Sequence, residues 1–312
     1  VLFKDQVKRG EKPSQVEATL KQEVKDRVSS STNVLRNRID QFGVVAPNIQ
    51  ELENDGQILL ELPGVKEHER VRELLKSSAN LEFYETTNVT DIASDLAALN
   101  KAIEADSTKN LRPLSQLLLG SDGNPIVVGI TTAANKAAVD SVINSALAKA
   151  TLPNNLKLAW EVKPQTVEST DSATGRKVVN EFYKLVALKT NNGKAALSGD
   201  VITAATSDYE RTQGNYVSMT MKSEAARQWA RITQDNIGKQ VAIVLDDHVY
   251  SAPRVNSVIE GGRSQITGDF TTDEAKDLAN VLKSGKMAAK VDIISDTVIG
   301  PSLGQQAIED GF

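Results

Sequence analysis

The densest group of side chains that could do chemistry is the run Asp246-Asp247-His248, because carboxylates and imidazole are metal ligands. Three adjacent residues at the end of a strand point in different directions, however, and cannot all reach one ion without distortion. We therefore interpret this run as a tight turn in which Asp247 takes a positive φ. The only other histidine, His68, lies among charged residues on a polar helix face, which indicates a solvated side chain. No metal site is predicted.

Other catalytic and cofactor patterns match equally poorly. The glycine-rich run 260–264 lacks the Gly-Lys-Ser/Thr ending of a phosphate-binding loop, and a strand at 265–267 follows it where such a loop needs a helix. We interpret it as a hairpin or bulge. The serines at 251, 264 and 302 have no histidine partner for nucleophilic catalysis, and the chain contains no cysteine. The sequence therefore predicts no catalytic, cofactor-binding or metal-binding residue, and a protein that is not an enzyme.

Charge and composition exclude several partners. The 312 residues carry a formal net charge of −5, which disfavours a nucleic-acid partner and a surface that binds anionic lipid. No run approaches the roughly 18–20 apolar residues that a membrane helix requires. Val1-Leu2-Phe3 leads directly into charged residues, so we expect no signal peptide. A chain of this length is expected to form two structural units.

The acidic run is expected to join two strands. Apolar alternation over 241–245 predicts a strand, and a returning strand follows the turn and ends at Pro253. Thr271 and Glu274 have capping-box spacing, and the apolar stripe after them predicts a helix that ends at Gly285. These elements indicate a sheet with a helix across it.

Residues 1–86 show the order helix, two strands, helix, strand. We read 1–23 as a solvated leader, either helical or frayed, and the apolar face from Val24 to Phe42 predicts a helix that Gly43 ends. The remaining elements are expected at 47–53, 57–62 and 66–77, with a primed turn at 54–56 and a last strand through Leu81 and Phe83.

Residues 191–312 repeat this order. A strand around 216–222 precedes a helix that Ser223 caps and that turns Ala225, Trp229 and Ile232 inward. We infer an α+β fold, in which a base of two ferredoxin-like β-α-β-β-α-β halves, 1–86 and 191–312, shares one sheet.

Residues 87–190 are expected to form an inserted α+β head subdomain. Apolar spacing predicts a short helix at 92–99, a second at 139–146, and strands at 156–162 and 182–188 joined by a loop at 168–177. Trp160 is either part of the head's core or part of an exposed apolar groove.

Several segments in fixed order resemble the first periplasmic domain of the SecD family, including members fused to SecF. These segments are VLRNRIDQFGV (34–44), LELPGV (60–65), ANLEFYET (79–86), LSGDVITAA (197–205), IVLDDHVYSAP (243–253), QITGDFTTDEAKDLANVLKSG (265–285) and VIGPSLG (298–304). The family's Asp-Leu-x-Gly-Gly strand is not present, which leaves open whether the first strand of the sheet is complete. Residues 87–190 show no convincing match to the family.

The resemblance implies a domain on the periplasmic side of the bacterial inner membrane, within a multi-spanning protein that uses the proton-motive force. Its implied partners are SecF, the Sec channel complex and unfolded exported polypeptide, whose late export it would assist. The alternative is a non-catalytic ligand-binding or scaffolding module that recognises a folded partner.

Two sets of residues are candidates for movement. The head leaves the base after Thr86 and returns at Thr190-Asn191-Asn192-Gly193, where permissive backbone indicates a hinge. A head that swings on this hinge would move or release bound polypeptide, and the alternative is a rigid spacer. The run Gly300-Pro301-Ser302-Leu303-Gly304 combines a fixed proline φ with permissive glycines, and we interpret it as a turn and as a connector to a following membrane helix.

Overall fold

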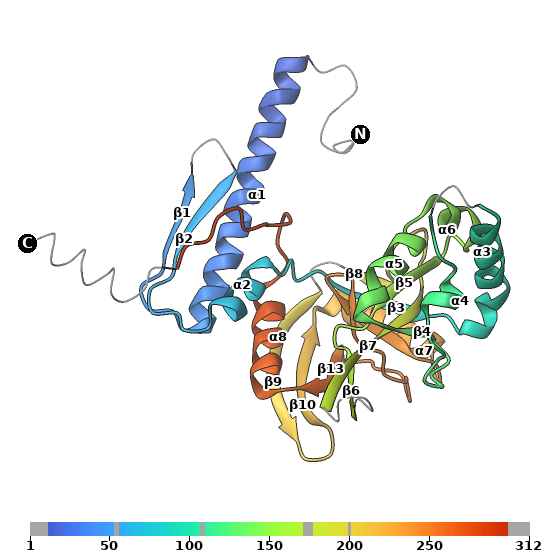
Figure 1. The fold of residues 1–312 in the computed structure, drawn as a ribbon. Helices are drawn as coiled ribbons and strands as arrows, with labels where there is room; N and C mark the ends of the chain where they lie inside the picture. The colour runs from blue at the N-terminus through green and yellow to red at the C-terminus, as the bar shows by residue number, and fades with distance from the viewer. Residues whose placement is uncertain (1–11, 53–55, 107–109, 171–176, 199–200, 299–312) are drawn as a thin grey trace, which may run out of the picture. The chain divides into compact units, whose positions relative to one another are not determined.

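The computed structural model describes residues 12–52, 56–106, 110–170, 177–198 and 201–298, and the fold is α+β (Figure 1). The chain forms two compact units. Unit 1 comprises Val1–Ser78 and Met287–Phe312, and unit 2 comprises Ala79–Lys286. Within the described ranges, every helix is too short or too polar to cross a bilayer.

Unit 1 is built on the long helix α1 (Pro13–Phe42), which ends where Gly43 takes a left-handed φ of 83°. Leu35 and Ile39 are buried on one face of α1, and they share a core with Val71 and Leu75 of α2 (His68–Lys76). Strands β1 (Asn48–Leu52) and β2 (Gln57–Glu61) pair antiparallel beside α1. The predictions of this helix end, both strands and the short helix are confirmed. Residues 1–11 of the predicted leader and 53–55 of the predicted turn lie outside the described residues.

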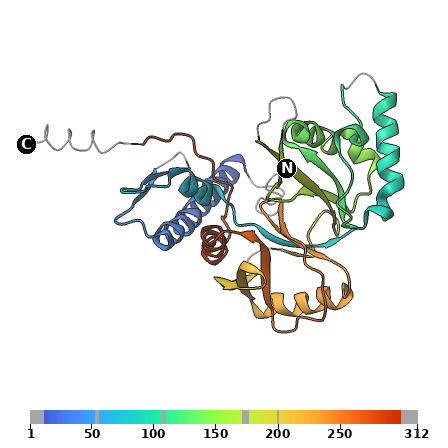
Figure 2. The same cartoon turned by 60° about the horizontal axis from the view of Figure 1, so that its bottom comes forward.

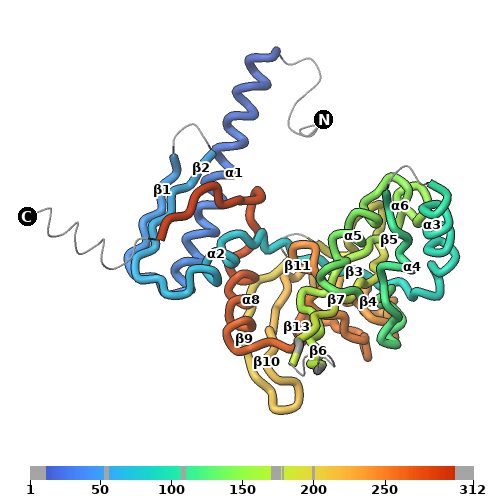
Figure 3. Tube along the Cα trace, in the orientation of Figure 1, coloured from blue at the N-terminus to red at the C-terminus, as the bar shows by residue number. Residues whose placement is uncertain are grey.

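The larger sheet of unit 2 has the order β12-β11-β3-β7-β4, and β3 and β11 lie side by side in the trace of Figure 3. Strands β5 and β6 also pair with β7, and β8 pairs with β3. Their bounds are β3 Leu81–Thr86, β4 Val127–Thr132, β5 Leu156–Trp160, β6 Gln165–Thr170, β7 Lys177–Lys189, β8 Leu197–Ser198, β11 Val241–Leu245 and β12 His248–Ser251. All five residues of β11 are buried, as befits a strand with neighbours on both sides.

Helices cover one side of this sheet at β4, β5 and β7 (Figures 1 and 2). They are α3 (Ala93–Ala105), α4 (Leu114–Leu117), α5 (Ala133–Ile143) and α6 (Ala146–Thr151), and the short η1 (Val89–Ile92) precedes α3. Their core contains Leu99, Val139 and Trp160, so Trp160 belongs to the core and not to an exposed groove.

The head differs from the prediction in three places. The single helix expected over 139–146 is wrong: α5 ends at Ile143, and Ser145 accepts a hydrogen bond from the Ala148 amide to start α6. The loop expected at 168–177 is wrong at both ends, because β6 continues to Thr170 and β7 begins at Lys177. Strand β4, whose alternate residues are buried, was not expected at all.

A second sheet has the order β13-β10-β9, formed by β9 (Ile202–Glu210), β10 (Gly214–Met221) and β13 (Arg263–Phe270). Helix α8 (Thr272–Ser284) contacts this sheet and begins with the predicted capping box of Thr271 and Glu274. Helix α7 (Ser223–Asp235) buries Ala225 and Trp229 as predicted. The predicted cap is wrong, because Lys222 holds the N-cap position and Ser223 is the first helical residue.

The ferredoxin-like halves stay a prediction. Strands β3 and β11, one from each proposed half, do lie in one sheet, whereas β1 and β2 pair only with each other among the described strands. The division into units falls at 78/79 and 286/287, away from the boundaries at 86/87 and 190/191 that we expected for the head.

Candidate functional site

The acidic run forms the predicted turn between β11 and β12. Asp246 and Asp247 both have left-handed φ values, 49° and 66°, the pair of values that a primed two-residue hairpin turn requires. The prediction of a positive φ at Asp247 is confirmed, and Asp246 shares it. The Asp246 carboxylate accepts the backbone N–H of Asn80 (3.0 Å), and the His248 ring nitrogen Nδ1 lies 2.9 Å from the Asp246 carbonyl oxygen.

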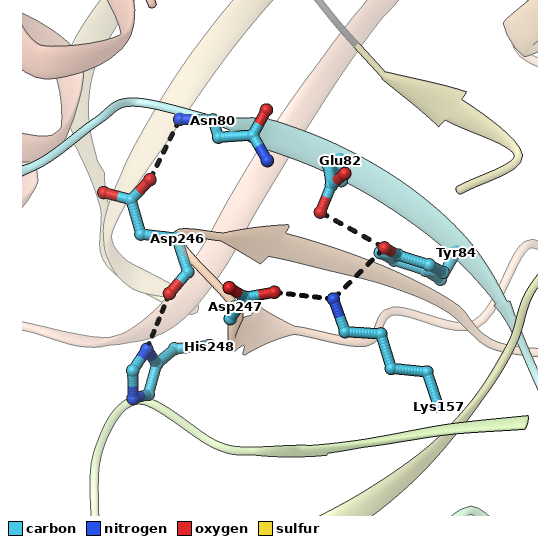
Figure 4. A network of polar contacts seen from close by, with 7 residues as sticks. All are labelled: Asn80, Glu82, Tyr84, Lys157, Asp246, Asp247 and His248. Carbon is cyan, nitrogen blue, oxygen red and sulfur yellow. Dashed lines mark hydrogen bonds and ion pairs between the residues drawn. The ribbon is translucent and has the colours of Figure 1, made fainter. Parts of the chain in front are cut away.

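The three side chains of the turn point to different neighbours (Figure 4). Among the described residues, no group of three or more histidine, cysteine, aspartate or glutamate side chains is arranged to hold a metal ion. His68 is exposed at the start of α2. The turn therefore acts through hydrogen bonds and an ion pair.

Lys157, on β5, is the centre of this polar network (Figure 4). Its ammonium group donates to Asp247 Oδ1 (2.6 Å) and to the Tyr84 hydroxyl oxygen (3.2 Å), and the Tyr84 hydroxyl donates to Glu82 (3.2 Å). Burial opposes the charged form of Lys157, but the hydrogen bonds to Asp247 and Tyr84 outweigh it and raise the pKa of this lysine. For Tyr84, in contrast, burial itself raises the pKa. The network ties the segment 87–190 to β3 and to the turn.

Further contacts attach the same segment to the rest of unit 2. The Val162 amide donates to the Val249 carbonyl (2.9 Å), beside a parallel bridge between Glu161 and Val249. The Lys163 ammonium forms an ion pair with Glu274 (2.6 Å) and donates to the Asp269 carbonyl. The attachment is thus made by backbone and side chains together.

The segment 87–190 also shares a hydrophobic core with its surroundings. Val186 and Leu188 of β7 are fully buried with Val244 of β11 and Val249 of β12. Separating the segment from the rest of unit 2 would expose these side chains to water, at a cost proportional to the apolar area uncovered.

The residues of the predicted hinge lie where the segment joins unit 2. Strands β3 and β7 pair at their last residues, Glu85 with Lys189 and Thr86 with Leu188. Thr190 is buried just beyond, and its amide donates to the Asn155 carbonyl (2.7 Å). The two points where the chain enters and leaves the segment 87–190 therefore lie together.

The return of the chain at this point is a tight turn. Asn192 and Gly193 have left-handed φ values of 50° and 76°, and Asn191 forms a bridge with Lys194. A left-handed φ is permissive for asparagine and glycine, as the sequence indicated. Their role as a hinge stays a prediction.

A polar cavity of 380 Å³ opens beside these residues. Glu85 and Lys189, which both line it, form an ion pair (2.7 Å), and the Asn236 side chain donates to the other Glu85 oxygen (3.0 Å). Burial acts to raise the pKa of Glu85, but the hydrogen bonds from Lys189 and Asn236 outweigh it and hold this pKa below its usual value. The Glu85 carboxyl group is therefore ionised at neutral pH.

The other predicted site residues do not join this cluster. The glycine-rich run 260–264 turns into β13, and a Cβ added at Gly262 would lie 2.6 Å from the Ala226 Cβ, so its glycine serves a close approach to α7. The connector Gly300-Pro301-Ser302-Leu303-Gly304 lies outside the described residues.

Sequence reasoning missed Lys157, Tyr84, Glu85 and Lys189. The partners in each contact are far apart in sequence, 90 residues for Lys157 and Asp247 and 104 for Lys189 and Glu85, so no local spacing could indicate them.

Two family models match the chain. One is described as the P1 domain of the protein translocase subunit SecDF, N-terminal part, and matches residues 28–88. The other is described as the P1 head subdomain of SecDF and matches residues 169–289. The head model thus runs past residue 190, where we expected the head to end, and stops close to the boundary of unit 2.

Individual relatives agree with these matches. The protein translocase subunit SecD of Rhodothermus marinus is 36% identical over 96% of this chain and 50% of its own length. That of Desulfurispirillum indicum is 31% identical over 93% of this chain and 44% of its own length. A crystal structure of SecDF in its super-membrane-facing form is 25% identical, with a TM-score of 0.51 over 92% of this chain and 30% of that one. The chain spans about half the length of the curated relatives it matches.

Proposed function

Because this chain belongs to the SecD family of protein translocase subunits, in the region of its P1 domain, we propose that it assists late protein export through the Sec channel. It binds unfolded polypeptide weakly on the periplasmic side of the inner membrane, and its movement moves or releases that polypeptide. In the full-length protein this movement is coupled to the proton-motive force, and SecF and the Sec channel are the partners. The domain itself does no enzymatic chemistry.

The observation that carries this proposal is the double crossing between the two compact units. The chain passes from one unit to the other at 78/79 and again at 286/287. Ala79 has a left-handed φ of 53°, unusual for a residue with a Cβ, and Gly285 has a φ of 86°. The Met287 amide donates to the Ser78 carbonyl (2.8 Å), so the two crossings lie side by side. Paired crossings, one at a residue with an unusual backbone angle and one beside a permissive glycine, favour a hinge.

This second hinge competes with the one predicted at Thr86 and 190–193. Movement at 86 and 190 must disrupt the shared core and the Lys157 network, whereas movement at 78/79 and 286/287 leaves both in place. We propose that the larger movement occurs between the units. Opening at 86 and 190 is then a rarer, costlier step.

Spin-label distances separate these hinges, and the absence of cysteine gives a clean background. Labels at Lys25→Cys and Lys101→Cys lie in different units and should give a broad or two-peaked distance distribution. Labels at Lys101→Cys and Arg227→Cys lie in unit 2 on either side of residue 190 and should give one narrow peak. A narrow peak for the first pair contradicts movement between units, and a broad peak for the second favours the hinge at 86 and 190.

The alternative function, recognition of a folded partner, is separated by binding. A panel of extended, unfolded peptides should bind the domain weakly, and the same sequences in a folded protein should not. Tighter binding to the folded form would favour the scaffolding alternative.

A further inference from the structure

The polar cavity beside Lys189 has the size of a binding site and an unusual lining. Its volume of 380 Å³ falls in the range of ordinary ligand pockets, which are mostly lined by apolar side chains. Here Ala196 is the one apolar residue in a lining otherwise made of carboxylate, ammonium, hydroxyl and carboxamide groups. A ligand that fits it must form hydrogen bonds.

Several of these groups have no internal partner. The side-chain amides of Asn155, Asn191 and Asn192 form no hydrogen bond with any other described residue. Thr190 is 6% exposed, and its buried hydroxyl has no hydrogen-bond partner within the described part of the chain. A buried hydroxyl without a partner destabilises the fold, so its presence at the wall of a cavity needs a reason.

The charges of the cavity indicate a neutral ligand. Glu85 and Lys189 neutralise each other, and both Glu85 oxygens are already engaged. A charged ligand would meet a pair with no net charge to attract it, whereas a neutral one can accept from the unused donors of the half-exposed Lys189 ammonium. Each free carboxamide offers one acceptor and two donors, which complement the N–H and C=O of a peptide bond.

We propose that this cavity binds the main-chain amides of an extended polypeptide, without regard to side-chain sequence. The inference rests on the proposed function, since an export factor meets unfolded chains of many sequences. It goes further by placing the contact at Asn155 and at 190–192. Water competes for the exposed carboxamides of this site, so binding is weak and readily reversed.

The test uses an unstructured, capped glycine–serine peptide as the probe, titrated into the 312-residue chain and followed by amide chemical shifts. Such a peptide has no charge and no apolar side chain, so it can bind only through its main chain and its serine hydroxyls, and trehalose reports what hydroxyls alone contribute. A polysarcosine peptide of equal length, which lacks the N–H groups, and trehalose, a neutral polyol, are the comparison ligands. The glycine–serine peptide should shift the amides around 190–192, and both comparison ligands should bind at least about fivefold more weakly, the effect of one lost hydrogen bond.

Matched variants locate the site. Asn192→Gly removes a cavity carboxamide at a left-handed position (φ 50°), and Asn110→Gly removes an exposed one at the same φ away from the cavity. Asn192→Gly should weaken probe binding about fivefold and Asn110→Gly should leave it unchanged. Thr190→Val should weaken binding while leaving the protein folded.

The outcomes separate this inference from the proposed function. If unfolded peptides bind but Asn192→Gly and Thr190→Val have no effect, the cavity site is wrong and the proposed function stands. Equal binding of trehalose overturns the assignment to main-chain amides. If no unfolded peptide binds the chain at all, both proposals fail.

Discussion

The substitution Trp229→Ala tests how α7 is held against the two sheets of unit 2. Trp229 is 4% exposed, and its ring centroid lies 4.8 Å from that of Phe83 on β3, with the planes tilted by 53°. Its indole N–H donates to the Ser264 hydroxyl on β13 (2.8 Å). The Trp229 side chain therefore contacts one strand of each sheet, β3 in the larger sheet and β13 in the second.

The expected cost follows from these contacts. Truncating a buried tryptophan to alanine costs about 3–5 kcal/mol through lost transfer free energy and the cavity left behind. The aromatic pair contributes about 0.5–1.5 kcal/mol, part of which that range already contains. The buried Ser264 hydroxyl also loses its donor. We expect a loss of about 4 kcal/mol in the free energy of unfolding.

The assay is urea unfolding followed by far-ultraviolet circular dichroism, which does not depend on the removed fluorophore. Trp229→Phe keeps most of the ring and loses the N–H, so it should cost about 1–2 kcal/mol. His248→Ala, on an exposed turn, should stay within about 0.5 kcal/mol of the parent protein. A larger loss for His248→Ala than for Trp229→Ala would refute the placement of α7.

Four further predictions concern other parts of the structure. Thr190→Val removes a buried hydroxyl without a partner, so it should raise the free energy of unfolding by about 1 kcal/mol or more in urea melts, and a loss would contradict this. Burial raises the pKa of Glu161, so the folded state holds the proton of this carboxyl group more tightly than the unfolded state does. The free energy of unfolding therefore falls as the pH rises above 4.5, the ordinary pKa of glutamate. Glu161→Gln should therefore stabilise the protein near pH 7 and have little effect near pH 3, and the opposite pH order in urea melts would be inconsistent with a raised pKa. A double-mutant cycle of Lys157→Met and Asp247→Asn should give a coupling of about 0.2–1 kcal/mol, because the Asp247 side chain is 77% exposed and the pair is screened by solvent. A ligand that binds only the folded state raises the melting temperature. Because no metal site is predicted, neither chelator nor added zinc should change the melting temperature. A rise of several degrees with zinc would argue for a site at Asp246–His248.

The sequence predicted elements whose signals are local. The capping box of Thr271 and Glu274 and the left-handed residue that ends α1, Gly43, depend on residues a few positions apart. The turn at Asp246-Asp247 likewise follows from steric limits on two residues between two apolar strands. Each of these local predictions is confirmed.

Other features depend on contacts that no local pattern carries. Leu118 and Leu119 lie against β4 at Gly129, where an added Cβ would be 2.9 Å from the Leu118 Cβ, and nothing near Gly129 in sequence shows that neighbour. The long β7 pairs with β3, β4, β5 and β6 along different stretches of its length, so a base and an inserted head could not be separated by reading the elements in order. The cavity needs Asn155 and Thr190 together, which only the pairing of β5 with β7 brings about.

The central claim, that movement between the two units serves export, is tested most directly in the full-length protein that contains this domain. One cysteine is placed in each unit, at positions that the spin-label distances show to approach each other, and export into membrane vesicles is measured with the disulfide closed and after reduction. We predict that export slows when the disulfide is closed and recovers when it is reduced, while either single cysteine has no effect. Export that continues undiminished with the disulfide fully closed would contradict the account.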